Sequence, residues 1–285
     1  MENLAVDSTS TQAAAATPKT GETQAAASDV ANNPEETKEE SKGSGFIYHG
    51  MGNVQNKNTV QKLESRKETW SSLNVPANIE AGLAKLNYYK PSIIQAASIP
   101  KIMASPNVNF AFQAMNGSGK TGAFVVPAMM RVDTSVLKVQ IIIMANTREL
   151  IRQITQVIEV LASETEVKTI LGERGQTEVG HILVTVPGYL KNKLVERGSK
   201  LDLSALKMVV YDEADELFDQ RSNHECFNQL KKSLSKINVA PQHCLYSATY
   251  TDTVVDFAKT IIGDYKYLPI KKEAQKLKGV KHFKM

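Results

Sequence analysis

Cysteine and long apolar runs are scarce in this chain of 285 residues. The two cysteines, Cys226 and Cys244, are too few for a framework of disulfide bonds, so we expect a reducing compartment, the cytoplasm and/or the nucleus. The longest aliphatic runs, residues 123–130 and 139–145, fall far short of the roughly 20 residues of a membrane-spanning helix. The sequence therefore argues against a secreted domain stabilised by disulfide bonds. It also predicts that the protein has no membrane partner.

Acidic charge is concentrated at the start of the chain, although the whole chain carries a net charge of +4. Residues 1–45 hold eight acidic and three basic side chains, a net charge of −5, which leaves +9 on the remainder. This segment has few large apolar residues and cannot offset its ordering entropy, so we expect a disordered acidic low-complexity tail. Glu2 and Asp7 also stand where a secretory leader carries positive charge. The basic remainder favours a polyanionic partner such as nucleic acid.

Short apolar runs alternate with amphipathic stretches from Trp70 onward. The expected strands are residues 108–113, 139–145, 167–171, 181–186, 206–211 and 243–247. The expected helices are residues 78–86, 92–103, 120–132, 148–162, 189–196, 226–234 and 253–262. This alternation predicts an α/β domain with a parallel sheet covered by helices on both faces. We expect that domain at 70–270, after a connecting segment at 46–69 and before a truncated linker at 271–285.

A phosphate-binding loop is the sharpest motif in the sequence. Residues 114–121 follow an expected strand, open an expected helix and fit G-x-x-x-x-G-K-[ST] with alanine as the first residue. Lys120 would reach the β- and γ-phosphates and the Thr121 hydroxyl would bind Mg²⁺. The predicted ligands are Ala114, Gly117, Ser118, Gly119, Lys120 and Thr121. The alternative, a glycine-serine turn that merely begins a helix, does not explain the order of strand, loop, Lys-Thr and helix.

An acidic cluster, Asp212-Glu213-Ala214-Asp215, follows the apolar strand expected at 206–211. A parallel strand that delivers a carboxylate at its C-terminal end can hold Mg²⁺ opposite a phosphate loop. Asp212 would hold the metal, largely through water, and Glu213 would orient and deprotonate the attacking water. Taken alone, such a cluster is more often a solvated helix start, and its pairing with the phosphate loop gives it a catalytic interpretation.

Ser247-Ala248-Thr249 ends another expected strand. Small hydroxyl residues are common at strand ends and helix caps, so this tripeptide carries little information alone. Beside the two preceding motifs, its hydroxyls could sense the γ-phosphate and pass that state to a neighbouring surface.

These motifs together resemble the DEAD-box ATP-dependent RNA helicases, over about residues 70 to 285. The resemblance implies a single RecA-like phosphate-loop domain that binds Mg²⁺ and ATP. Residues 70–73 and 277–283 are most similar to the branch that includes the mRNA-export helicase of the nuclear pore. Residues 88–95 resemble the adenine-reading motif of the family, in which Gln95 would select ATP over GTP through its amide and an aromatic ring would stack on the base. The resemblance further places in the nucleotide site Trp70, Tyr88, Gln95, Asp215, Ser247 and Thr249.

The resemblance also implies contacts to RNA, either single-stranded or a short duplex, gripped by its backbone without sequence specificity. The residues that match the RNA motifs of the family are Thr147, Arg148, Gly172, Pro187 and Gly188. Without its neighbours Arg148 would be read as an ordinary surface partner of Glu149 or Gln153.

Departures from the family pattern fall mostly on the RNA side. The substituted positions are Asn87, Asn146, Glu173, Val186 and Tyr189. At Val186 and Tyr189 a hydroxyl and a cation expected near phosphate are missing, and Glu173 replaces the second glycine of a double-glycine motif. Its carboxylate would repel RNA phosphates. The nucleotide motifs are nearly intact by comparison.

The arginine motif of the family's second domain, His-Arg-x-Gly-Arg, does not occur in these residues. Arginines of this kind contribute about 10³ to 10⁵ in rate, so we expect weak ATP hydrolysis unless a second RecA-like domain completes the site. The alternative function is a non-catalytic half-helicase that binds RNA or a helicase partner as a regulator. An unrelated phosphate-loop ATPase is disfavoured by the Gln95 motif and by residues 212–215.

Overall fold

The computed structural model describes residues 68–173, 179–199 and 201–270. The expected acidic tail, the expected final linker and nearly all of the expected connecting segment lie outside these residues. The helices are η1 Ser71–Leu73, α1 Ala77–Lys85, α2 Ile93–Ala104, α3 Lys120–Met130, α4 Arg148–Ala162, α5 Pro187–Val195, α6 Ala214–Asp219, α7 Arg221–Lys236 and α8 Asp252–Ile262. The strands are β1 Asn109–Gln113, β2 Ile141–Met144, β3 Thr169–Gly172, β4 Ile182–Thr185, β5 Met208–Asp212, β6 Gln242–Ser247 and β7 Tyr265–Pro269.

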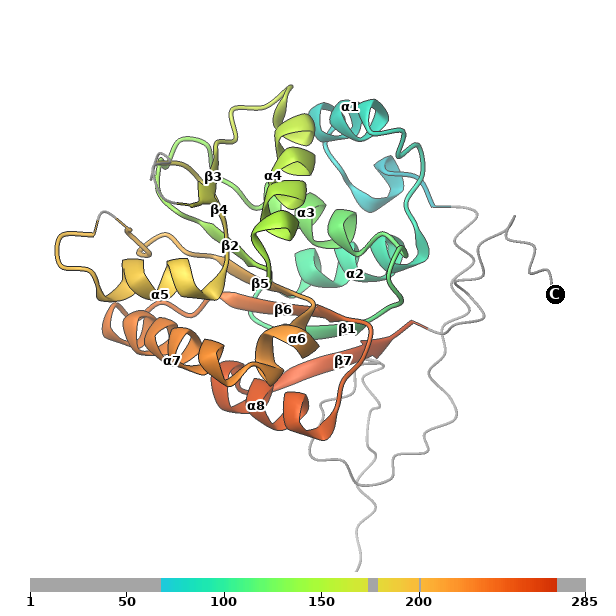
Figure 1. Cartoon of the computed structure of the whole chain (residues 1–285). Coiled ribbons are helices and arrows are strands. Elements are labelled where there is room, and N and C mark those ends of the chain that lie inside the picture. Colours follow the sequence, from blue (N-terminus) through green and yellow to red (C-terminus); the bar gives the residue numbers. More distant parts are fainter. Residues whose placement is uncertain (1–67, 174–178, 200, 271–285) are drawn as a thin grey trace, which may run out of the picture. The chain divides into compact units, whose positions relative to one another are not determined.

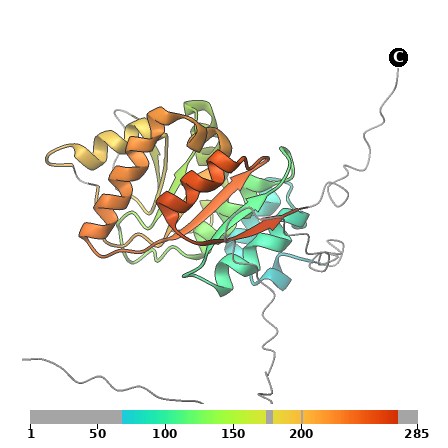
Figure 2. The ribbon, with the colours of Figure 1, turned by 90° about the horizontal axis from the view of Figure 1, so that it is seen from below.

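The strands form one 7-stranded sheet in the order β3-β4-β2-β5-β6-β1-β7. Every pair of neighbouring strands is parallel. Helices α1 to α4 cover one face of the sheet and α5 to α8 cover the other (Figures 1 and 2). The expected α/β class, with helices on both faces of a parallel sheet, is confirmed.

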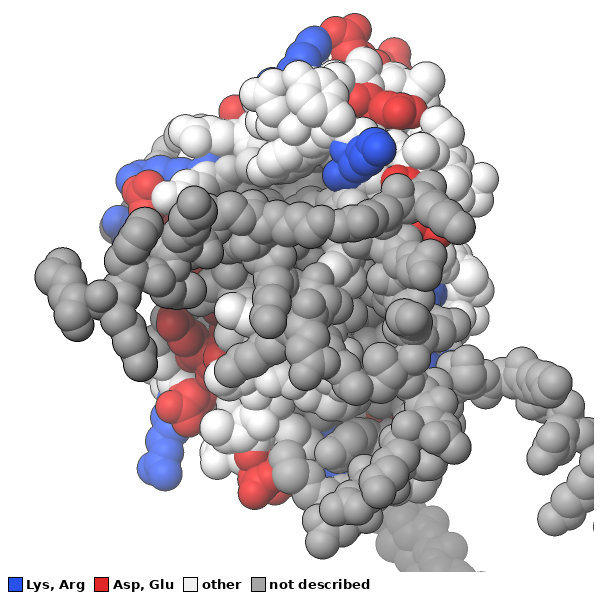
Figure 3. Space-filling view, turned by 90° about the vertical axis from the view of Figure 1, so that its right-hand side faces the viewer, with Lys and Arg blue, Asp and Glu red and all other residues white. Residues whose placement is uncertain are grey.

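Charged side chains of both signs lie on the surface of the described residues. In the part of Figure 3 that grey atoms leave visible, basic and acidic side chains are interspersed among uncharged ones. Several of them form exposed ion pairs. These pairs are Lys85–Glu164, Lys138–Asp202, Lys191–Glu225 and Lys193–Glu196. Exposed pairs of this kind stabilise a fold little, by about 0 to 1 kcal/mol each.

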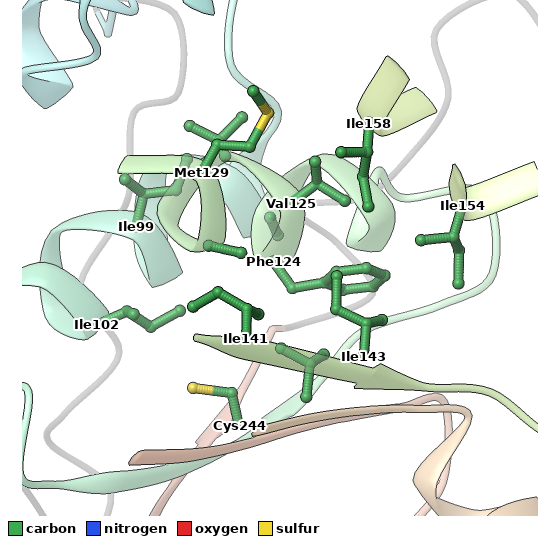
Figure 4. Close-up of a cluster of buried hydrophobic side chains, with 14 of the residues drawn as sticks. Ile99, Ile102, Phe124, Val125, Met129, Ile141, Ile143, Ile154, Ile158 and Cys244 are labelled. Atoms are coloured by element: carbon green, nitrogen blue, oxygen red, sulfur yellow. The ribbon is translucent and has the colours of Figure 1, made fainter. Parts of the chain in front are cut away.

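Two apolar layers, one on each face of the sheet, explain why the strands lack polar alternation. Successive side chains of a strand point to opposite faces. In β2, Ile141 and Ile143 therefore pack under α3, whereas Ile142 and Met144 join the layer beneath α5 to α8. Figure 4 shows Ile141 and Ile143 beside Phe124 of α3. A strand buried on both faces must be apolar at every position, as β2 is.

Three elements differ from the sequence-based expectation. The edge strand β7 was not expected, because Lys266 and Pro269 interrupt its apolar character and only Tyr265 is buried. Helix α6 was not expected either, since it is short and three of its six residues are acidic. Helix α7 begins at Arg221 rather than at the expected 226. In each case the missing signal is an apolar pattern of sufficient length.

Among the described residues, no helix combines the length and the apolar character needed to cross a membrane.

Helix α1 rests on α4 at a glycine, and this contact yields a prediction. A Cβ added to Gly82 would lie 2.6 Å from Leu161 Cα and 2.8 Å from its carbonyl oxygen, both backbone atoms. We expect Gly82→Ala to lower the free energy of unfolding by about 2 kcal/mol, because overpacking outweighs the better helix propensity of alanine. Urea unfolding measures this change.

Gly188→Ala is the matched control, since a Cβ at this helical glycine meets nothing within 4 Å. We expect this variant to be as stable as the wild type or more stable by up to about 1 kcal/mol. A Gly82→Ala protein as stable as the Gly188→Ala protein would contradict the backbone contact between α1 and α4.

Candidate functional site

Three adjacent strands bring the expected nucleotide motifs together. Strands β5, β6 and β1 are neighbours, and in parallel strands the carboxyl ends meet at one edge of the sheet. The phosphate loop follows β1, the acidic cluster follows β5 and the Ser-Ala-Thr motif follows β6. The backbone N–H of Ala114 donates to the carbonyl oxygen of Ser247 at 3.0 Å, so two of the three motifs are in direct contact.

The phosphate loop connects β1 to α3 through two glycines in a left-handed conformation. Gly117 has φ of 75° and Gly119 has φ of 94°. Only glycine adopts such backbone angles without strain, and these angles let the loop turn into the first turn of α3. The buried hydroxyl oxygen of Ser118 has no hydrogen-bond partner among the described residues. A buried orphan hydroxyl at a helix start matches a loop shaped for an oxygen-rich ligand.

Lys120, the first residue of α3, is folded back into its own loop. It is 9% exposed, and its Nζ donates to Asn116 Oδ1 at 2.8 Å and to the carbonyl oxygen of Ala114 at 3.4 Å. The ammonium group therefore lies over the hollow of the loop, where a phosphate could replace the amide as its partner. The contact of Asn116 was not foreseen from the sequence, because nothing in the motif indicates where an asparagine side chain at that position points.

The acidic cluster begins at the end of β5, close to Lys120. Asp212 is 7% exposed, and burial raises the pKa of its carboxyl group to about 6, although the nearby Lys120 ammonium opposes this shift. Burial, with repulsion from Glu216, also raises the pKa of Glu213. Glu213 has φ of 51°, a left-handed conformation that is unusual for a residue other than glycine. A carboxyl group with a raised pKa is suited to accept a proton near neutral pH.

The Ser-Ala-Thr motif is joined to the acidic cluster by hydrogen bonds. Thr249 Oγ1 donates to Asp215 Oδ2 at 2.5 Å. The Ser247 hydroxyl donates to the carbonyl oxygen of Thr249 at 2.7 Å and accepts from its N–H at 3.0 Å. Both hydroxyls are thus engaged within the protein. The structure gives them a connecting role between the ends of β5 and β6, beside their expected place in the nucleotide site.

Gln95 links the expected adenine motif to the phosphate loop. Its Oε1 accepts from the N–H of Ser92 at 2.7 Å, and its Nε2 donates to the carbonyl oxygen of Gly119 at 3.0 Å. A Cβ at Gly122 would lie 2.5 Å from Nε2, so the amide packs directly on α3. The first of these bonds belongs to a capping box at the start of α2. The spacing Ser-x-x-Gln could have revealed that box from the sequence.

Trp70, expected in the nucleotide site, lies within the apolar core of the structure. Its ring is 1% exposed within the apolar layer under α1 and α2, and its Nε1 donates to the carbonyl oxygen of Tyr88 at 2.6 Å. A ring enclosed by the core offers no face to a base, so Trp70 instead fixes the segment that carries Tyr88. Tyr88 itself is 42% exposed and remains able to meet a ligand. Asn87 beside it has φ of 61°, the turn geometry expected of asparagine in place of glycine.

The expected RNA residues occupy the other half of the same edge. They follow β2, β3 and β4, which are consecutive strands in the sheet. Thr147 caps α4 by accepting from the N–H of Leu150 at 3.2 Å, and Arg148 is exposed in the first turn of that helix. Gly172 ends β3, where a Cβ would lie 2.4 Å from Thr185 Oγ1 of β4. This glycine is therefore required by packing, whatever else it contacts.

Pro187 and Gly188 form the first turn of α5, after β4. Val186 precedes them and provides no side-chain cap. The family pattern has a hydroxyl residue at position 186. Because valine stands there, no side chain caps the first N–H groups of α5. The residues expected to bind nucleotide follow β5, β6 and β1, and those expected to bind RNA lie at the ends of β3, β4 and β2, so the two expected sets divide the sheet edge into two halves.

The nucleotide half fits Mg²⁺ and ATP by the chemistry of its donors. Magnesium prefers oxygen ligands and takes only one or two from the protein in nucleotide sites, and the Asp212 carboxylate and the Thr121 hydroxyl are oxygens of this kind. A phosphate group would meet the Lys120 ammonium, the orphan hydroxyl of Ser118 and the N–H groups at the start of α3. In the sheet β6 separates β5 from β1, and α3 follows β1 in the chain (Figure 1).

This chain resembles many curated proteins and solved structures. The ATP-dependent RNA helicase DBP5 of Mycosarcoma maydis is 32% identical over 226 residues, which cover 76% of this chain and 48% of that protein. The DEAD-box ATP-dependent RNA helicase 38 of Arabidopsis thaliana is 32% identical over 228 residues, covering 76% and 46%. The chain spans about half the length of these curated relatives.

The structure of S. cerevisiae Dbp5 bound to RNA and ADP BeF3 has a TM-score of 0.65 at 27% identity, covering 75% of this chain and 55% of that one. A DEAD box protein from the hyperthermophile Methanococcus jannaschii has a TM-score of 0.63 at 27% identity, covering 72% and 57%. These likenesses confirm the RecA-like fold and the distant relationship to DBP5-type helicases.

Residues 92–257, more than half of the chain, match the sequence profile of the DEAD/DEAH box helicases. On this match and on the identity to DBP5, the chain belongs to the DEAD/DEAH box helicase family.

Proposed function

We propose that this chain is the ATP-binding domain of an ATP-dependent RNA helicase, which binds Mg²⁺ and ATP on one half of the sheet edge and RNA on the other. The observation that supports this most is the meeting of Lys120, Asp212 and Ser247 at the ends of three adjacent strands. The relative S. cerevisiae Dbp5 has been solved bound to RNA and ADP BeF3, which supports both ligands for this chain.

The residues of the nucleotide half have separate tasks in the proposed reaction. Lys120 and the N–H groups of the phosphate loop bind and orient the phosphates. Glu213 holds the attacking water and accepts its proton at a carboxylate oxygen, a task to which its raised pKa is suited. Mg²⁺, held by Asp212 and Thr121, would neutralise charge on the phosphate oxygens. Hydrolysis at a useful rate further requires the arginines of a second RecA-like domain.

Coupling between the two halves passes through β5 and β2, which are adjacent in the sheet. Asn146, after β2, donates from Nδ2 to Glu216 Oε2 of α6 at 3.2 Å. Helix α6 directly follows Glu213. A nucleotide-dependent movement of the acidic cluster would therefore be passed to the RNA half through the single hydrogen bond between Glu216 and Asn146. RNA bound there would be held through its backbone, without sequence specificity.

Nucleotide titration tests the adenine assignment. The Gln95 amide keeps one N–H and one oxygen lone pair beyond its two internal hydrogen bonds, which suffices to read an adenine edge. We expect ATP to bind at least about tenfold more tightly than GTP, because a wrong base leaves a buried amide group unpaired. Calorimetric titration of both nucleotides with Mg²⁺ measures the ratio. Equal affinities, or no binding of ATP, would contradict the assignment.

A second candidate function is a half-helicase that regulates a helicase partner or occupies RNA without hydrolysing ATP. The observation in its favour is the altered RNA half, where Val186 leaves a helix start uncapped and Glu173 adds a carboxylate. Both candidates place the protein in the cytoplasm and/or the nucleus, where RNA helicases meet their substrates.

A further inference from the structure

We propose that Glu173 sets the RNA affinity of this chain by holding Arg152 in an ion pair at the RNA half of the sheet edge. The proposal rests on the function proposed above. Arg152 Nε lies 3.0 Å from Glu173 Oε1, and Arg152 Nη2 donates to Glu173 Oε2 at 3.0 Å. The second of these contacts is a charge-assisted hydrogen bond, whereas Glu173 Oε1 has no hydrogen-bond partner among the described residues, so a single hydrogen bond and the opposite charges hold the pair. The Glu173 side chain is 17% exposed and the Arg152 side chain is 51% exposed, so the carboxylate is the better enclosed partner and the guanidinium remains open to solvent.

The pair lies among the residues assigned to RNA. Glu173 follows Gly172 directly at the end of β3. Arg152 lies four residues after Arg148 on α4, and residues spaced in this way share one face of a helix. Arg148 and Arg152 therefore present two cations in a row toward the edge. The carboxylate of Glu173 neutralises the second of them.

Two lysines of α5, the helix that begins at this edge, are also paired. Lys191 pairs with Glu225 at 3.1 Å, and Lys193, in the last turn of the helix, pairs with Glu196 at 2.9 Å. Arg148 has no hydrogen bond or ion pair within the described part of the chain. A phosphate backbone arriving here would thus meet one unpaired guanidinium, and it would have to displace a carboxylate to gain a second. Glu173 therefore lowers the affinity for RNA in two ways: its carboxylate repels phosphate, and its ion pair keeps Arg152 from binding phosphate.

Glu173→Gln tests the proposal, because it removes the charge and retains the size of the side chain. We expect binding of an oligouridine, measured by fluorescence anisotropy with Mg²⁺ and a non-hydrolysable ATP analogue, to become about fivefold tighter. The slope of log K against log salt should steepen by about 0.7, the value of one further phosphate contact on a single strand. Arg152→Ala should bind more weakly than the wild type, and it should cancel the gain when combined with Glu173→Gln.

Glu164→Gln is the matched control. Glu164 is also paired with a basic side chain, Lys85 at 2.5 Å, but it lies beyond the opposite end of α4. This variant changes the net charge equally and should leave affinity and salt slope unchanged. An unchanged or weaker affinity of Glu173→Gln, or an equal gain in Glu164→Gln, would overturn the proposal.

The role of Glu173 and the assignment of RNA to this edge can be tested separately. If the wild type binds oligouridine and Glu173→Gln binds no more tightly, only the role of Glu173 is wrong. If neither protein binds oligouridine while both bind ATP, the assignment of RNA to this edge is wrong, and the role of Glu173 falls with it.

Discussion

Replacing Lys120 by alanine is expected to weaken ATP binding by about 100-fold. The ammonium group is nearly buried and directed over the phosphate loop by Asn116 Oδ1 and the carbonyl oxygen of Ala114. In such a site, truncating one partner of a charge-assisted hydrogen bond costs about 3 kcal/mol, which corresponds to about 100-fold in the dissociation constant. Calorimetric titration of Mg²⁺ and ATP measures the loss.

The fold should survive this change, because both hydrogen bonds of Lys120 are made within its own loop. We expect an unchanged far-ultraviolet spectrum and an unfolding free energy within about 1 kcal/mol of the wild type. Lys85→Ala is the matched control, since its ammonium group is paired with Glu164 on the surface, away from the loop. Wild-type affinity in Lys120→Ala would rule out the phosphate loop as the nucleotide site. Equal losses in both variants would point to net charge instead.

Much of this fold could be predicted because the central strands are recognisable in the sequence as continuous apolar runs. β2 reads Ile-Ile-Ile-Met since helices cover both of its faces, and no polar residue is tolerated on either. β7 could not be predicted for the opposite reason. Within the described part of the chain it lies at the end of the sheet and pairs with β1 alone, and so it keeps a lysine and a proline that a central strand would not carry.

For the site, too, the local sequence predicts the types of residue but not how they are brought together. The spacing of the phosphate loop and of the acidic cluster predicts which residue types meet phosphate and metal. The order β5-β6-β1, which brings them together, is a property of the whole sheet and is not written in any motif. The ion pair of Arg152 and Glu173 likewise joins α4 to the end of β3, and its partners lie 21 residues apart. Motif matching also cannot report burial, and it therefore did not indicate that the Trp70 ring lies within the core.

A separate second RecA-like domain that carries the family's arginines is expected to raise ATP turnover by this chain about 10³-fold. These arginines stabilise charge on the transferring phosphoryl group, and removing one costs about 10³ to 10⁵ in rate. Within the described residues, the nucleotide half holds Lys120 as its buried cation, beside carboxyl groups of raised pKa. Phosphate release, measured with Mg²⁺, ATP and RNA while the second domain is titrated, gives the turnover.

Two variants make this result specific. A second domain with its arginines replaced by alanine should bind without stimulating hydrolysis. Glu213→Gln in this chain should retain ATP binding and lose stimulation, because an amide cannot accept the proton of the attacking water. If turnover stays at the basal rate although RNA or the second domain is bound, the intact nucleotide half does not serve hydrolysis. The half-helicase that acts as a regulator would then be the better description, because the altered RNA half would be the feature that defines the protein.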